Sequence, residues 1–296
     1  MKNPILTFGL LLSALIISQS AWTDDGQSFF ENIDYDWMKN PYWFDGKAEI
    51  NFYDATIMRY GQPRETQEIY QIVVAERHRT DQKVKADDWR APDAMPVLKF
   101  NFVLNFQTGI YTYHQMASIF FKQEDAHVYK MTLTSNEWCG NTFKEIVHFE
   151  DTHVLNYNSY FDGTGSGSYP LPDEKDLVLY DGLPVQLRAL KFQTGKSLDL
   201  KLLSKQITNN ARKPELSLAK IEIGEKETLK TPMGDIQTYA LVVKHGQGQD
   251  KFWIEAKFPN RVIKWRTFDG SEFTLRQTKK LEYWKLNKAG GEKYLE

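Results

Sequence analysis

Apolar and polar residues alternate along residues 97–107, which is the spacing of a β-strand. The apolar positions are Leu98, Phe100, Phe102, Leu104 and Phe106. Successive side chains of a strand point to opposite faces, so this strand should present one strongly apolar face. Thr108 and Gly109 can form a tight turn, and residues 110–121 and 128–134 repeat the alternation. The pattern predicts an antiparallel meander over residues 97–140.

Further strand-like runs lie on both sides of this meander, separated by Gly, Pro, Asn and Asp turns. They cover residues 47–53, 57–60, 67–76, 142–150, 153–161, 197–207, 219–230, 235–245, 251–257, 261–267 and 272–284. Residues 80–96 are polar, contain two prolines and predict a long surface loop. About a dozen strands without long helices between them predict a mainly antiparallel β protein.

Two segments have helical rather than alternating patterns. In residues 27–39, Phe29, Phe30, Ile33 and Trp37 recur at steps of three and four, as in an amphipathic helix. Residues 173–190 predict short helices broken at Gly182 and Pro184. A large sheet with one apolar face must curve around something, so we predict a strongly curved sheet or open barrel with one or two short helices as its plug.

The composition changes abruptly at residues 162–176, which are rich in Gly, Ser and Pro. This stretch favours either a linker or a mobile loop over a ligand site. A linker would divide an N-terminal β region, residues 21–161, from a C-terminal β region, residues 177–296. One continuous domain is the alternative, because all-β folds of this size often form a single body.

The N-terminus has the features of a secretory signal peptide. Lys2 precedes an apolar run over residues 5–17, and small residues at Ser18 and Ser20 suit cleavage after Ser20, with a buried helix as the alternative. No cysteine lies near this point to carry a lipid, and no later run is long enough for a transmembrane anchor. We therefore expect a periplasmic or secreted protein that begins at Ala21.

Composition and charge exclude several functions. With 37 basic and 39 acidic residues, the chain of 296 residues lacks the basic surplus expected of a nucleic-acid-binding protein. It has no nucleotide-binding glycine motif, and its one cysteine and six histidines have no paired spacing that suits a metal. His148 and His153, the closest pair, fall on either side of a turn. We therefore predict no cofactor and no metal.

Cys139 is the one candidate catalytic residue. It follows Glu137 and Trp138 at a strand end, and His114 on a preceding strand could serve as its base in a hydrolase or transferase. The sequence offers no acid to orient the histidine and no helix start to lower the thiol pKa. The simpler prediction is a free thiol that is buried beside Trp138 and inert.

Aromatic residues make up 14% of the chain and gather in the meander. Large exported β proteins with many rings often enclose an apolar cavity, although a solid core would use the rings equally well. The candidate ligand-binding residues are Phe102, Tyr111, Tyr113, Phe120 and Trp138.

Several short sequence motifs resemble those of a family of exported bacterial proteins of unknown function, whose members are sometimes labelled septum formation inhibitors. The motifs are Arg59-Tyr60-Gly61, residues 73–76, 83–87 and 97–99, residues 106–113, and Glu137-Trp138-Cys139-Gly140. Residues 221–284 are more loosely similar to exported curved-sheet domains, whose likeness to lipoprotein carriers supports a cavity. The polar residues of these motifs would mark a site, and they are Arg59, Glu76, Lys85, Lys99 and Glu137.

These observations favour an exported protein that binds a lipid-like or amphipathic ligand or an envelope protein. The alternatives are a cysteine-dependent enzyme and a structural partner in envelope assembly.

Overall fold

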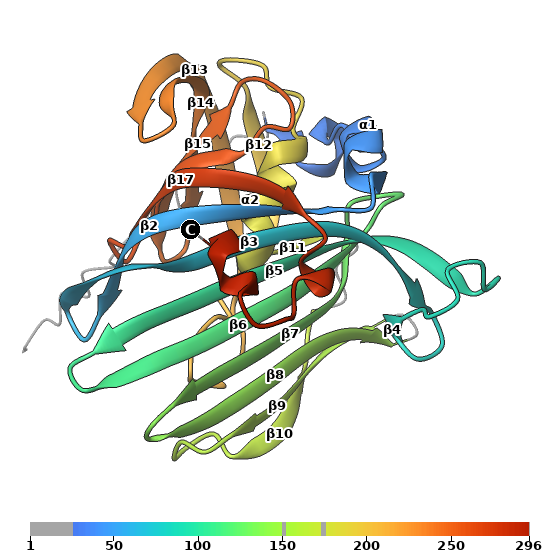
Figure 1. The fold of residues 1–296 in the computed structure, drawn as a ribbon, viewed down its shortest axis with the longest axis vertical. Coiled ribbons are helices and arrows are strands. Elements are labelled where there is room, and N and C mark those ends of the chain that lie inside the picture. The colour runs from blue at the N-terminus through green and yellow to red at the C-terminus, as the bar shows by residue number, and fades with distance from the viewer. Residues whose placement is uncertain (1–25, 150–151, 173–175, 296) are drawn as a thin grey trace, which may run out of the picture.

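The computed structural model describes residues 26–149, 152–172 and 176–295 (Figure 1). The predicted signal peptide lies outside the described residues. Most of the chain belongs to one large twisted sheet, as Figure 1 shows. Its strands are β1 (Gln27–Ser28), β2 (Ala48–Arg59), β3 (Gln62–Arg79), β4 (Val84–Lys85), β5 (Ala94–Thr108), β6 (Tyr111–Lys122), β7 (Val128–Glu137), β8 (Gly140–Phe149), β9 (Thr152–Ser159), β10 (Ser166–Pro170), β11 (Leu177–Leu179), β12 (Ser197–Leu203), β13 (Leu216–Thr231), β14 (Gly234–His245), β15 (Gly248–Glu255), β16 (Val262–Arg266) and β17 (Glu272–Leu281).

Neighbouring strands are antiparallel, apart from the parallel contacts of β1 and β11 with β12 at one edge. From that edge the order runs β12-β13-β14-β15-β16-β17-β2-β3-β5-β6-β7-β8-β9-β10, with β4 beside the end of β3. No pairing of described residues joins β10 to β11, so the sheet stays open. The predicted class, a mainly antiparallel β protein with short helices, is confirmed.

The helices are all short: η1 (Phe30–Asn32), α1 (Tyr35–Met38), η2 (Pro41–Phe44), η3 (Tyr180–Gly182), α2 (Leu183–Gln186), η4 (Leu187–Ala189), η5 (Tyr283–Lys285) and η6 (Gly291–Leu295). Within the described residues none is long and apolar enough to span a bilayer. The continuous helix expected over residues 27–39 is wrong. Ile33 is extended and bridges to Leu190, and Asp34 starts a new helix by accepting a hydrogen bond from the Asp36 amide.

The helices of residues 30–44 and 180–189 form the predicted plug, whereas η5 and η6 have no buried residues. The buried rings of residues 29–43 and the apolar side chains of residues 177–190 belong to the same core cluster as the inner faces of β2, β5, β6 and β12–β17. Within the plug, Arg188 forms a buried ion pair with Glu49 of β2, with 2.8 Å between Nη1 and Oε1. Arg188 also donates to the carbonyls of Pro259 and Asn260. One side chain therefore ties the plug to two parts of the sheet.

The predicted N-terminal and C-terminal β regions share this sheet and this core. They meet where β17 pairs with β2. Within the Gly/Ser/Pro stretch, Ser166–Pro170 forms β10, which pairs in register with β9.

Candidate functional site

Because neighbouring strands are antiparallel, alternate turns gather at one end of the sheet, which we call the turn end. It carries the β2–β3, β5–β6, β7–β8 and β9–β10 turns of the first half, and Figure 1 shows these turns side by side. The β12–β13, β14–β15 and β16–β17 connections of the second half end there too. Three of the sequence motifs, those that contain Arg59, Tyr111 and Trp138, lie at this end.

Arg59 is the centre of the site at the turn end. Its Nη2 donates to the Tyr113 hydroxyl and to Asn209 Oδ1, both at 3.0 Å, and its guanidinium lies over the rings of Tyr60 and Tyr113. Its Nε is buried without a hydrogen-bond partner, and no carboxylate of the described residues pairs with it. Hydrogen bonding to Tyr113 raises the pKa of Arg59 although burial opposes this, so the side chain stays charged.

An aromatic series extends from this arginine. Tyr113 stacks on Phe106 with 5.0 Å between ring centroids, and its hydroxyl lies 2.7 Å from that of Tyr60. Tyr111 contacts both Tyr113 and Trp138. The structure thus brings together three of the predicted ligand-binding residues, Tyr111, Tyr113 and Trp138, with the predicted polar residue Arg59.

Two hollows adjoin Arg59. The first, the inner pocket, has a volume of about 250 Å³. Its apolar lining consists of Ile57, Met58, Leu104, Phe106, Ile207, Phe268 and Phe273. The second, the basic pocket, has a volume of about 520 Å³, and its charged lining consists of Arg59, Lys144, Lys205, Arg212, Lys213 and Glu215. Arg59, Lys205, Thr208 and Gln247 line both, so the two pockets share a wall.

The basic pocket has little compensating negative charge. Lys205 pairs with Asp269 at 3.0 Å. Among the described residues no carboxylate forms an ion pair with Arg59, Lys144, Arg212 or Lys213, although Glu215 lies in the lining. Several unpaired cations around one hollow favour an anion as its occupant.

Lys144 is the most unusual of these cations because only 3% of its surface is exposed. Its Nζ donates to the Gln206 carbonyl at 2.8 Å and to Thr208 Oγ1 at 3.2 Å. Burial lowers the pKa of Lys144 to about 8, and the carboxylate of Asp181 opposes this shift only in part. Lys144 therefore changes charge close to neutral pH, where lysine side chains ordinarily do not.

Glu137 lies at the turn end, in the β7–β8 hairpin, whereas Glu76, Lys85 and Lys99 form a separate cluster on the outer face. Lys99 Nζ lies 2.6 Å from Glu76 Oε1, Lys85 lies beside His78 in the β3–β4 pair, and the His78 ring contacts Phe120. Glu76, Lys85, Lys99 and Phe120 therefore do not reach the turn end. Lys99 and Glu76 form an ion pair, so most of the charge in this cluster is compensated within it.

Phe102 lies in the core, with ring contacts to Phe100, Trp265 and Phe273. Farther along β5, Leu104 and Phe106 line the inner pocket. The apolar face of β5 is thus packed along part of its length and lines a hollow only near the turn end.

The prediction that Cys139 is buried is wrong, because Cys139 is exposed in the β7–β8 turn. Register explains the error: Glu137 pairs with Gly140, so Trp138 and Cys139 form the turn itself. Glu137 accepts a hydrogen bond from the Cys139 amide at 2.6 Å, and its interaction with the thiol raises the pKa of Cys139. His114 forms its hydrogen bond with Asn105. This geometry disfavours the thiolate that catalysis would need.

No group of three or more metal-ligating side chains exists among the described residues. His148 and His153 pair across β8 and β9 through their backbones.

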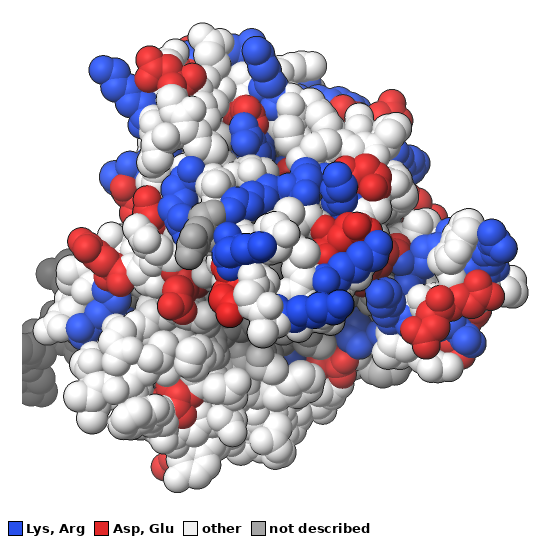
Figure 2. Space-filling model, in the orientation of Figure 1, with Lys and Arg blue, Asp and Glu red and all other residues white. Residues whose placement is uncertain are grey.

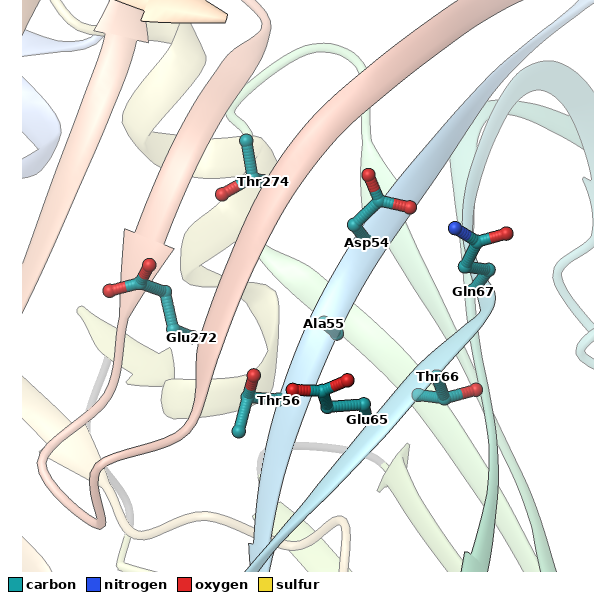
Figure 3. Close-up of a pocket in the computed structure, with 8 residues that line it drawn as sticks. All are labelled: Asp54, Ala55, Thr56, Glu65, Thr66, Gln67, Glu272 and Thr274. Carbon is teal, nitrogen blue, oxygen red and sulfur yellow. The ribbon is translucent and has the colours of Figure 1, made fainter. Parts of the chain in front are cut away.

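A further hollow, on β2, β3 and β17, is shown in Figure 3 and contains Asp54, Glu65 and Glu272. Glu272 already pairs with Lys264 and Arg266, and the other two carboxylates lie apart in the figure, so this hollow lacks a focused charge.

Sequence reasoning missed the residues of the basic pocket other than Arg59. Arg212 and Lys213 lie in the connection between two predicted strands, which has no pattern of its own, and Lys144 resembles any polar position of an alternating strand. The one available signal was a lysine on the inner, apolar side of β8, between Thr142 and Ile146.

Comparisons with protein-family models, with curated proteins and with solved structures found no match.

Proposed function

We propose that this protein binds an amphipathic anion, with the acidic group of the ligand in the basic pocket and its apolar part in the inner pocket. The observation that carries this proposal is the shared wall of the two pockets, where Arg59 holds its charge beside Phe106 and Ile57. A ligand with one charged and one apolar end would satisfy both hollows at once. A purely apolar lipid would leave the cations uncompensated.

The size of the pockets limits the ligand. Sites for small molecules usually occupy about 300–1,000 Å³, and the inner pocket alone is smaller than that range. It therefore suits a short alkyl chain or a ring system, or the end of a longer chain. The acidic group is a carboxylate or a phosphate, because arginine and lysine donors bind both.

The N-terminal pattern and the resemblance to exported proteins support a place outside the cytoplasm, where such a ligand would come from the cell envelope. Cell fractionation together with N-terminal sequencing tests this location. An intact Met1 in the cytosol would contradict it.

Arg59→Gln is expected to weaken binding of decanoate by about tenfold or more, because a charged hydrogen bond contributes about 1.5–3 kcal/mol. Binding of the uncharged analogue decanol should change much less. Titration calorimetry measures both ligands on the same protein. Arg266→Gln is the matched control, because it also removes one positive charge but lies in an exposed ion pair with Glu272. Equal losses in the two variants, or no binding of decanoate by the unaltered protein, would contradict the proposal.

Lys144 should make this binding depend on pH. As pH rises through about 8, Lys144 loses its charge in the free protein, so affinity for decanoate should fall. At pH near 8, binding of the anion should draw a proton onto Lys144, and calorimetry in buffers of different ionisation enthalpy measures this uptake. Lys144→Met should abolish the proton uptake. Persistence of that uptake in the variant would assign it to another group.

A further inference from the structure

Four turns at the turn end each present a large apolar or aromatic side chain to solvent. These are Tyr60 in the β2–β3 turn, Ile110 in β5–β6, Trp138 in β7–β8 and Tyr160 in β9–β10. Their exposed fractions are 63%, 79%, 75% and 74%, respectively. Together they form a series that we call the tip row.

The tip row departs from ordinary turn chemistry. Two-residue hairpin turns favour Gly, Asn and Asp, as in the Gly246-Gln247 turn between β14 and β15. Tyr60 instead occupies a turn position with φ of 54°, which a bulky side chain rarely adopts. The fold therefore keeps a tyrosine where glycine or asparagine would be less strained, and such strain is concentrated at functional positions.

Local contacts fix the tips in place. The Tyr60 hydroxyl bonds to that of Tyr113, and the Trp138 ring contacts Tyr111. The Tyr160 ring lies over Gly140 so closely that a Cβ there would come within 2.4 Å of it. These three rings are thus positioned by contacts within the protein although most of their surface is exposed.

The surroundings of the tip row are suited to a bilayer. Figure 2 shows that the outer surface over β6–β9, which leads to these turns, has few charges, whereas charges crowd the strands above. The basic pocket opens at the same end through Arg59, next to Tyr60, and has Arg212 and Lys213 in its lining. Tyr and Trp prefer the headgroup level of a membrane, isoleucine prefers the acyl region, and basic residues attract anionic headgroups.

We propose that the tip row docks this protein onto the surface of an anionic phospholipid bilayer, with the side chains of Ile110 and Trp138 entering the interface. A protein partner is less well matched, because four separate projecting tips do not form the continuous flat patch that a protein interface of ordinary size buries. Docking goes beyond the proposed binding function and would occur with the pockets empty. It would place the basic pocket at the headgroup layer, from which an amphipathic anion could enter.

Flotation with vesicles tests the docking. The protein is purified as the cell makes it, with its N-terminus determined, and mixed with vesicles of phosphatidylglycerol and phosphatidylcholine. Ile110→Gln with Trp138→Gln should lower vesicle affinity by about tenfold or more, because two apolar groups no longer enter the membrane. Trp89→Gln with Val84→Gln is the matched control, since both residues are exposed and lie in or next to β4, at the opposite end of the sheet. All variants share the same N-terminus, so its contribution cancels.

Cys139 provides a second readout, because this single cysteine lies beside Trp138 and is exposed. An environment-sensitive maleimide dye on Cys139 should shift its emission to the blue when anionic vesicles are added, and much less with vesicles of phosphatidylcholine alone. Unchanged emission, equal flotation of the tip and control variants, or no flotation of the unaltered protein would each overturn the proposal. Ile110→Gln alone should retain decanoate binding, so failure of docking and failure of the proposed ligand site give different results.

Discussion

Glu49→Ala should lower the free energy of unfolding by about 3–5 kcal/mol, because it leaves the buried Arg188 guanidinium without its carboxylate. Arg188 is 1% exposed and Glu49 is fully buried, so water cannot replace the lost partner. Urea unfolding followed by circular dichroism measures the change. Since Arg188 links the plug to β2 and to the β15–β16 turn, the variant should also loosen the plug.

The double variant Glu49→Leu with Arg188→Met is the informative control. A buried ion pair can often be replaced by apolar residues at little cost, so the double variant should be more stable than the sum of the two single variants predicts. Its recovery should be incomplete, because Tyr42 and Asn51 also donate to Glu49 and would lose their acceptor. Strict additivity would show that the two side chains do not act as a pair.

The same pair sets an acid limit on stability. Burial opposes ionisation of Glu49, but Arg188 and the hydrogen bonds from Asn51 and Tyr42 hold its pKa below the ordinary value. The stability from this depressed pKa is therefore complete above the pKa of glutamate in the unfolded chain. It is lost as pH falls through the lower pKa of the folded protein.

Phe102→Ala should cost about 3–5 kcal/mol of folding free energy, the range for removing a buried phenylalanine ring. Phe102 contacts Phe100, Trp265 and Phe273, so truncation would leave a cavity among rings that cannot easily collapse. Decanoate affinity should be unchanged once the variant is folded. Thermal unfolding and calorimetry on the same samples provide both quantities.

Two further variants serve as comparisons for Phe102→Ala. Met116→Ala, on the exposed face of β6, should change stability by no more than about 0.5 kcal/mol. Phe106→Ala should weaken decanoate binding, because Phe106 lines the inner pocket and supports Tyr113. A small stability loss with altered binding in Phe102→Ala would instead place Phe102 at a ligand.

The sequence predicted the strands well because alternation is a local signal, and β5, β6, β14 and β17 begin or end close to their expected positions. It could not predict that residues 27–39 would break at Ile33, because the bridge from Ile33 to Leu190 depends on tertiary structure. The exposure of Cys139 was missed for a related reason. A shift of a single residue in the end of a strand decides whether the next residue packs inward or forms the turn.

The candidate site was predicted in part. The many aromatic residues of the meander indicated Tyr111, Tyr113 and Trp138, and the sequence motifs indicated Arg59. The sequence could not show that Glu76 and Lys85 lie in a different cluster, nor that Lys144 and Arg212 join Arg59. These residues meet through pairings of strands distant in the chain and through a loop whose Asn209 carbonyl accepts from Thr142.

The pairing of β2 with β17 has a consequence for how the chain folds. The two strands pair from Ala48 with Leu281 to Thr56 with Glu272, although they lie near opposite ends of the described chain. Contacts between such distant segments slow folding, because a large loop must close before they form. During synthesis one edge of β2 stays unpaired until β17 has been synthesised. The early half is therefore exposed to aggregation for as long as translation takes, and a holding chaperone should act on it during that interval.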